Sequence, residues 1–161
     1  MSVVGPKALE PRLKQREFVA FRIAGQEFAL DIMSVREIRG WTPTTQLPDS
    51  PDYVKGVVNL RGAVLPILDL AVRLGFHAAE PTSRHAIIVV QIGKRVVGLL
   101  VDGVSEIMGI DDVLVQPVPS IGSLQSNGAL EGVMAAEGRM IGLLSLATML
   151  PPTEPAWSEA A

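Results

Sequence analysis

The stretch Tyr53–Leu74, YVKGVVNLRGAVLPILDLAVRL, occurs twice in this chain. The segment Ala129–Leu150, ALEGVMAAEGRMIGLLSLATML, lies 76 positions further on and aligns with the first without a gap. The shared positions are glycines and leucines: Gly56, Gly62, Leu68, Leu70 and Leu74 fall on Gly132, Gly138, Leu144, Leu146 and Leu150. An internal duplication is therefore the first hypothesis about the fold.

The segments upstream of these two also match each other: Ile23–Leu30 resembles Ile92–Leu99, and Val35–Ile38 resembles Val104–Ile107. Each repeated unit is near the lower size limit for an independent core, so the two should share an interface. The expected organisation is a flexible tail at 1–16, a first barrel at about 17–75, a connector at 76–83, a second barrel at about 84–150 and a tail at 151–161. We allow for elements exchanged between the barrels.

Short runs rich in apolar and β-branched residues predict strands separated by tight turns. Glycines mark four hairpins, at Ala24–Gly25, Arg61–Gly62, Gly93–Lys94 and Glu137–Gly138. Residues 35–39 fit either a strand or one helical turn. The sequence thus predicts an all-β protein of two small β-barrels that are closed or nearly closed.

Two or three short helices complete the prediction. Asp69 and its counterpart Ser145 each precede a leucine-rich segment, and both residue types can accept hydrogen bonds from the free amides at a helix N-terminus. We therefore expect helices at Leu70–Leu74 and Leu146–Leu150.

The composition excludes several classes of function. A net charge of −3 and a pI of about 5.4 argue against nucleic acid as a partner. The chain has no cysteine, which excludes disulfides and thiolate metal sites. It lacks an apolar run long enough for a signal peptide or a bilayer span, so we expect a cytoplasmic protein without membrane insertion.

Candidate catalytic residues are few. His77 and His85 lack the spacing of a metal site and are interpreted as surface or hinge histidines. The pair Asp111–Asp112 is typical of a solvated turn. No serine stands in a nucleophile-elbow motif, and no phosphate-binding glycine loop is present. We expect neither an enzyme nor a bound metal or cofactor.

The two copies differ most clearly at one hairpin turn, where residues 59–62 read NLRG and residues 135–138 read AAEG. The shared glycine is explained by the fold. Arg61 is a candidate for function, because the planar donor fork of arginine suits a partner's carboxylate or carbonyl groups. The alternative interpretation is a solvated cation at the tip of a hairpin.

Residues 42–52 contain three prolines, which remove amide donors and favour extended conformations. We expect a surface loop here that makes no ladder pairing, followed by an exposed aromatic residue, Tyr53.

At these residues the chain resembles CheW, the family of adaptors that couple bacterial chemoreceptors to the histidine kinase CheA. The similarity covers most of residues 17–150, and the run ending in NLRG is fairly specific to the family. The matching segments are Phe28–Ile32, Val35–Ile38, Leu47–Pro48, Tyr53–Gly62 and Pro66–Leu70.

The resemblance implies two five-stranded SH3-like barrels, no enzymatic activity and recruitment to membrane-associated receptor arrays. It also implies two partners: the helical hairpin tip of a chemoreceptor's cytoplasmic region, held in the cleft between the barrels, and the regulatory domain of CheA. Two alternatives stay open. One is an adaptor of the same fold in a type IV pilus or gliding-motility pathway, and the other is a small β-barrel that binds a metabolite between its halves.

Two surfaces of the first barrel are expected to carry these functions. The predicted receptor-binding residues, of which Val35, Glu37 and Arg61 should lie near one another, are Val35, Glu37, Ile38, Asn59 and Arg61. The predicted kinase-binding residues, around the proline-rich loop and the strand after it, are Leu47, Pro48, Tyr53 and Gly56.

Overall fold

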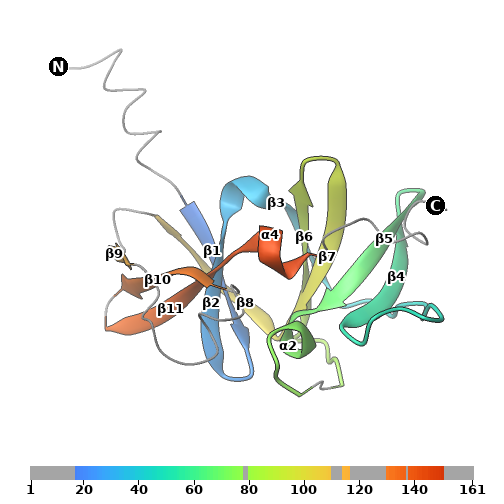
Figure 1. Cartoon of the computed structure of the whole chain (residues 1–161), viewed down its shortest axis with the longest axis horizontal. Helices are drawn as coiled ribbons and strands as arrows, with labels where there is room; N and C mark the ends of the chain where they lie inside the picture. Colours follow the sequence, from blue (N-terminus) through green and yellow to red (C-terminus); the bar gives the residue numbers. More distant parts are fainter. Residues whose placement is uncertain (1–16, 78–79, 110–113, 117–129, 137, 151–161) are drawn as a thin grey trace, which may run out of the picture.

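The computed structural model of the chain describes residues 17–77, 80–109, 114–116, 130–136 and 138–150, which form two β-sheets lying side by side (Figure 1). Sheet A contains Glu17–Ile23 (β1), Gln26–Asp31 (β2), Gly103–Gly109 (β8), Leu114–Gln116 (β9), Leu130–Ala136 (β10) and Arg139–Leu144 (β11), in the order β8-β1-β2-β11-β10-β9. Sheet B contains Val35–Gly40 (β3), Val54–Leu60 (β4), Ala63–Asp69 (β5), Ala86–Ile92 (β6) and Arg95–Val101 (β7), in the order β3-β6-β7-β5-β4. The expected all-β fold of two SH3-like barrels is confirmed, with a sixth strand, β9, in sheet A.

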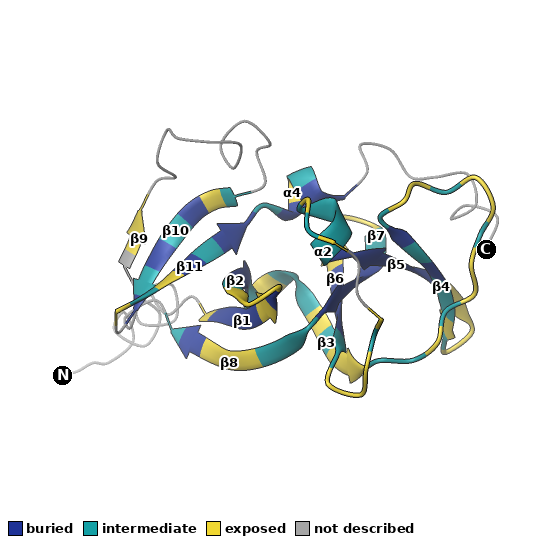
Figure 2. Ribbon diagram, turned by 90° about the horizontal axis from the view of Figure 1, so that it is seen from below, coloured by how far each residue is buried: buried dark blue, intermediate teal, exposed yellow. Residues whose placement is uncertain are grey.

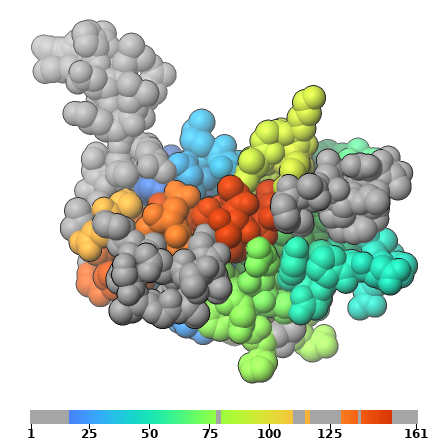
Figure 3. All heavy atoms as spheres, in the orientation of Figure 1, coloured from blue at the N-terminus to red at the C-terminus, as the bar shows by residue number. Residues whose placement is uncertain are grey.

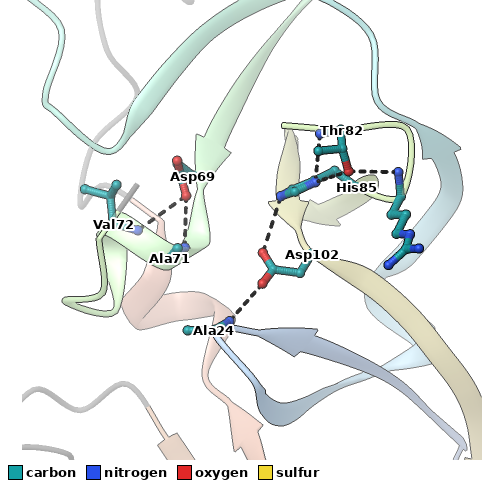
Figure 4. Close-up of polar contacts among 8 residues, drawn as sticks. Ala24, Asp69, Ala71, Val72, Thr82, His85 and Asp102 are labelled. Atoms are coloured by element: carbon teal, nitrogen blue, oxygen red, sulfur yellow. Dashed lines mark hydrogen bonds and ion pairs between the residues drawn. The ribbon is translucent and has the colours of Figure 1, made fainter. Parts of the chain in front are cut away.

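Three short helical segments lie among the described residues: Ile32–Ser34 (η1), Leu70–Arg73 (α2) and Leu146–Met149 (α4). The Asp69 carboxylate caps α2 by accepting hydrogen bonds from the amides of Ala71 (3.0 Å) and Val72 (3.3 Å) (Figure 4). Ser145 does not cap α4 in this way, because its hydroxyl lies 3.2 Å from the Thr148 hydroxyl instead. The cap prediction is therefore confirmed at Asp69 and wrong at Ser145.

The glycines shared by the two copies occupy equivalent places. Gly56 and Gly132 each follow a β-bulge, in the β4–β5 and β10–β11 hairpins respectively. Gly62 and Gly138 have φ values of 87° and 79° in the two hairpin turns. Positive φ is a conformation that glycine adopts without the steric cost that a Cβ brings. The duplication read from the sequence is thus present in the backbone.

The two repeats are interlocked, because each sheet takes strands from both. In sheet B, β5 of the first repeat runs parallel to β7 of the second, with Ile67 opposite Gly98. In sheet A, β11 of the second repeat runs parallel to β2 of the first, with Leu143 opposite Ala29. Leu143 is the repeat counterpart of Ile67, and Ala29 is that of Gly98. The same contact is therefore made twice, once in each direction.

The boundaries at 75 and 84 consequently separate the repeats but not the sheets. The hairpin β1–β2 lies in sheet A with β8 to β11, and the hairpin β6–β7 lies in sheet B with β3 to β5. A hairpin alone leaves both of its edges unpaired. The β1–β2 hairpin is flanked by β8 and β11, and the β6–β7 hairpin is flanked by β3 and β5.

The described residues form three hydrophobic cores, and Figure 2 shows buried residues concentrated on the strands. One small core belongs to sheet A, around Phe18, Met134 and Ile141, and another to sheet B, around Leu65 and Ile87. The largest core combines side chains from both sheets and both α-helices. Its contributors include Phe21, Leu30, Leu68, Leu70, Ile88, Leu99, Leu146 and Met149.

A polar junction fastens the connector to the β1–β2 turn (Figure 4). The Thr82 amide donates to Nδ1 of His85 at 3.0 Å, which leaves the ring proton on Nε2, 3.5 Å from an Asp102 carboxylate oxygen. The other Asp102 oxygen accepts a hydrogen bond from the amide of Ala24 at 2.9 Å, in a turn where Ala24 has a φ of 53°. His85, expected to be a surface or hinge histidine, links the connector to Asp102, and Asp102 in turn holds the β1–β2 turn.

Candidate functional site

The side chains of Glu37 and Arg61 meet although β3 and β4 are the two opposite edge strands of sheet B. Glu37 comes from β3, Arg61 from the β4–β5 turn, and the Arg61 guanidinium donates a hydrogen bond to the Glu37 carboxylate. Arg39 donates to the second carboxylate oxygen at 3.3 Å. The pair borders a groove of about 270 Å³ whose walls include Leu60, Val64, Val89 and Val96. A charged pair therefore lies beside an apolar hollow.

The hydrogen bond from Arg61, with a smaller contribution from Arg39, holds the pKa of the Glu37 carboxyl below its ordinary value. A depressed carboxyl pKa means that the ion pair's stabilising effect is present above the unfolded-state pKa. That effect is lost as the pH falls through the folded-state pKa. At neutral pH both partners are charged.

We expect Arg61→Ala to raise the pKa of Glu37 toward its ordinary value, because the variant removes the stronger donor to the carboxylate. An NMR titration of the Glu37 side-chain carboxyl carbon measures this. Arg39→Ala serves as the matched control and should raise the pKa less. An unchanged Glu37 titration in Arg61→Ala would mean that the ion pair does not persist in solution.

Val35 lies apart from this pair, contrary to the expectation that it adjoins Arg61. A β-bulge between Val35 and Glu37 places Val35 opposite Val90 and Glu37 opposite Val89. Val90 belongs to the large shared core, against which Val35 packs, and Val89 belongs to the small core of sheet B. Residues two apart normally share a face of a strand, and the extra residue of the bulge reverses that relation.

The two other predicted receptor-binding residues have distinct surroundings. Ile38 is 42% exposed, which is high for a large apolar side chain on a strand. Asn59 uses its side-chain oxygen to accept a hydrogen bond from the Gly62 amide at 3.0 Å. That bond closes the turn in which Arg61 and Gly62 both have positive φ. Asn59 therefore fixes the backbone that presents Arg61.

The second repeat carries an equivalent ion pair that the sequence comparison missed. Glu106, the counterpart of Glu37, accepts a hydrogen bond from Arg139, and Arg139 also donates to Glu27 at 3.0 Å. Arg139 stands one residue after the turn glycine, whereas Arg61 stands one residue before it. A position-by-position alignment sets Arg61 against Glu137 and so hides the relation. The presence of an arginine is thus common to both copies, and its exposure differs: 66% for the Arg61 side chain and 35% for Arg139.

The predicted kinase-binding loop is partly paired and partly exposed. Thr45 forms a two-way backbone bridge with Val57, at 2.9 Å in each direction, so the expectation of a loop without ladder pairing is wrong at this residue. Pro48 is exposed and Leu47 is half-buried. Gly56 is buried beneath the loop, because a Cβ on it would lie 2.5 Å from the Thr45 carbonyl oxygen. Gly56 allows the loop to approach β4 this closely.

Tyr53 is half-buried and packs against the large core, whereas an exposed ring was expected. The guanidinium of Arg73 lies over the ring, 5.1 Å from its centre. The sequence around Arg73 offers no sign of this contact, because the two residues belong to different elements.

No cluster of three or more His, Asp or Glu side chains with the geometry to hold a metal ion occurs in the described part of the chain. Within the same residues, no helix is both long and apolar enough to cross a membrane.

Comparison with known proteins agrees with the fold. The family model described as the CheW-like domain matches residues 17–154. A probable chemotaxis protein CheW of Rhizobium etli is 56% identical over 146 residues, which cover 91% of this chain and 92% of that protein. The chemotaxis protein CheW of Rhizobium meliloti is 57% identical over 139 residues, covering 86% and 90%.

A solved structure extends the similarity to three dimensions. The crystal structure of the scaffolding protein TtCheW from Thermoanaerobacter tengcongensis matches with a TM-score of 0.77 at 27% identity, covering 88% of this chain and 98% of that one. The same family is indicated by the interlocked sheets, by the family match over residues 17–154 and by the two close relatives. The chain therefore belongs to the CheW family of chemotaxis adaptor proteins.

Proposed function

We propose that this protein is a non-catalytic scaffold that holds the cytoplasmic hairpin tip of a chemoreceptor and the regulatory domain of the histidine kinase CheA at the same time. Receptor state then reaches the kinase through the geometry of the shared scaffold. The protein acts in the cytoplasm and is recruited to receptor arrays. The chemotaxis names of both close relatives favour this pathway over a pilus or gliding system and over a metabolite-binding barrel.

The observation that carries the receptor side of this proposal is the exposed ion pair of Glu37 and Arg61. Among the described residues, the Arg61 guanidinium is paired only with Glu37, and through a single nitrogen, so further donors of its fork remain for a partner. Val64, 38% exposed, supplies apolar area in the groove beside the pair. Ile38, 42% exposed, follows Glu37 on β3 and lies opposite Ile88, so its apolar area is on the other face of the strand. We assign Glu37, Ile38 and Arg61 to the receptor contact, with Asn59 and Val35 supporting them from the turn and from the core.

The kinase side is assigned to the loop at 42–52 and the residues that follow it. Pro48 is exposed, the Ser50 hydroxyl donates to the Leu47 carbonyl at 3.0 Å, and the Thr45–Val57 bridge anchors the loop to β4. A loop fixed in this way loses little entropy when a partner binds. Leu47, Pro48 and Tyr53 provide its side chains, and Gly56 supports the loop from below.

We expect Arg61→Ala to weaken receptor binding by roughly 1 to 3 kcal/mol, because a charge-assisted contact is lost at a partly desolvated interface. Unfolding free energy should change by no more than about 0.5 kcal/mol, since the side chain is mostly exposed. Affinity for a receptor tip fragment and the melting temperature are measured on the same preparation.

Arg139→Ala is the matched control, because it removes the equivalent ion pair from sheet A and leaves Glu37 and Arg61 in place. If the Arg139→Ala variant is folded, it should bind the receptor fragment with the affinity of the parent protein. An Arg61→Ala variant that binds the receptor as the parent does, or one that loses receptor binding no more than Arg139→Ala, would contradict the assignment.

A further inference from the structure

Arg73 lies where the two repeats meet, at the end of α2. Its Nε donates a hydrogen bond to the Met149 carbonyl at 3.0 Å, and its Nη2 donates to the Thr148 carbonyl at 2.8 Å. Met149 is the repeat counterpart of Arg73. A residue that touches its own counterpart lies close to the axis relating the repeats. In Figure 3 the surface of the α2 segment, light green, accordingly adjoins that of α4, orange-red.

These contacts use the particular shape of arginine. The last carbonyls of a helix have no intrahelical partner, and two parallel donors of a planar guanidinium can satisfy two of them together. The Cζ atom of the same group lies over the Tyr53 ring, 5.1 Å from the ring centre, in a cation–π contact. One side chain of the first repeat thus binds the C-terminal end of α4 and the aromatic ring beside the proline-rich loop.

Tyr53 is held at its backbone as well as at its ring. Its carbonyl accepts a hydrogen bond of 2.7 Å from the amide of Asp69, the residue that caps α2. The amide of the next residue, Val54, donates to the Pro51 carbonyl at 3.0 Å. The backbone of Tyr53 is therefore anchored to α2 and to the loop, and its ring contacts Arg73 and the large core.

We propose that Arg73 is a positioning residue of the kinase-binding surface: it fixes the Tyr53 ring by tying it to the end of α4. The inference rests on the proposed placement of the kinase on loop 42–52 and Tyr53. It adds that the affinity of this first-repeat surface depends on a contact with the second repeat. Fixing one side chain before binding changes affinity roughly threefold to tenfold.

The test measures the affinity of CheA's regulatory domain for four variants of the full chain: Arg73→Ala, Arg73→Lys, Tyr53→Leu and the double variant Arg73→Ala with Tyr53→Leu. Arg73→Ala should weaken binding roughly threefold to tenfold. It should add nothing in the Tyr53→Leu background, because there is no ring left to position. Arg73→Lys keeps the charge but loses the two-donor fork, so it should fall between the parent and Arg73→Ala.

A second readout follows the ring itself. Tyr53 is the single tyrosine of the chain, so its ring NMR signals can be assigned directly. They should shift in Arg73→Ala and Arg73→Lys, and should stay in place in the control Arg22→Ala, which alters an exposed arginine on β1. Full kinase affinity in both Arg73 variants, or additive losses in the double variant, would overturn the role of Arg73. The role of Arg73 would also be overturned if Arg73→Ala bound less only because part of it is unfolded, while Arg73→Lys was folded and bound the kinase normally.

A failure of the proposed kinase contact at loop 42–52 and Tyr53 would give a different set of affinities. If Tyr53→Leu is folded and binds the kinase as the parent does, the kinase does not use this surface, and the role of Arg73 falls with it. If Tyr53→Leu weakens binding and the Arg73 variants do not, the surface stands and Arg73 alone is excluded.

Discussion

Residues 1–80 and 81–161, produced as two separate polypeptides, should each fail to fold and should fold when mixed. The first fragment would hold β1 and β2 without β8 and β11, and β3 and β5 without β6 and β7. Every one of these missing neighbours is a hydrogen-bonded partner in the intact chain. The large core would also lose about half of its side chains, because both fragments contribute to it.

Far-ultraviolet circular dichroism and size-exclusion chromatography of each fragment, and of an equimolar mixture, measure this. The mixture should show the strand spectrum and the cooperative melting of the intact protein, at a lower melting temperature that rises with concentration. A monomeric fragment that melts cooperatively by itself would contradict the interlocked description of the sheets.

Gly56→Ala should destabilise the protein by roughly 2 to 4 kcal/mol, the sum of a strained backbone and an overpacked contact. Gly56 has a φ of 151°, and an added Cβ would lie 2.5 Å from the Thr45 carbonyl oxygen and 2.9 Å from the Thr44 Cβ. Neither neighbour is the far end of a flexible side chain. Both would have to move, and the Thr45–Val57 bridge would move with them.

Two glycines provide matched controls for Gly56→Ala. Gly62→Ala meets no atom within 4 Å at a φ of 87°, so only the backbone term remains and the cost should be about 1 kcal/mol. Gly132→Ala alters the repeat counterpart, where the nearest atom would be the Gln116 carbonyl oxygen at 3.1 Å. It should therefore cost less than Gly56→Ala. Chemical denaturation of the three variants gives the order, and equal losses for Gly56→Ala and Gly62→Ala would contradict the close approach of the loop.

The same geometry affects how the kinase surface can be probed. A charged residue at position 56 would displace the loop before it met any partner, so lost binding in such a variant reports on the loop. Substitutions at Pro48 and Tyr53 leave this close approach intact and test the surface more directly.

The features that could be predicted from the sequence are those with a local cause. The repeat with its shared glycines gave the hairpins and the two-barrel fold, and an aspartate before a leucine-rich segment gave the cap of α2. The proximity of Glu37 and Arg61 was also predicted, through the family resemblance. Each of these depends on residues close together in the chain or on a motif preserved intact.

What escaped prediction depends on register and on distant neighbours. One extra residue in β3 turns Val35 toward the core and away from Glu37, and hydrophobic periodicity does not reveal a bulge of this kind. Arg139 was missed because it follows its turn glycine, Gly138, whereas Arg61 precedes Gly62, so the two arginines do not align. The cation–π contact of Arg73 with Tyr53 joins two segments whose proximity follows only from the assembled sheets.

The reciprocal pairing of β2 with β11 and of β5 with β7 has the geometry of two identical chains that exchange strands about a twofold axis. In such a dimer every surface would exist twice, and each substitution would appear on both sides. Joining the copies in one polypeptide removes that constraint. Glu37 with Arg61 and Glu106 with Arg139 are therefore free to differ, and their arginines are 66% and 35% exposed. A molecule with two unlike ion-pair surfaces can offer a different face to each of two partners, whereas a symmetric dimer offers the same face to every neighbour.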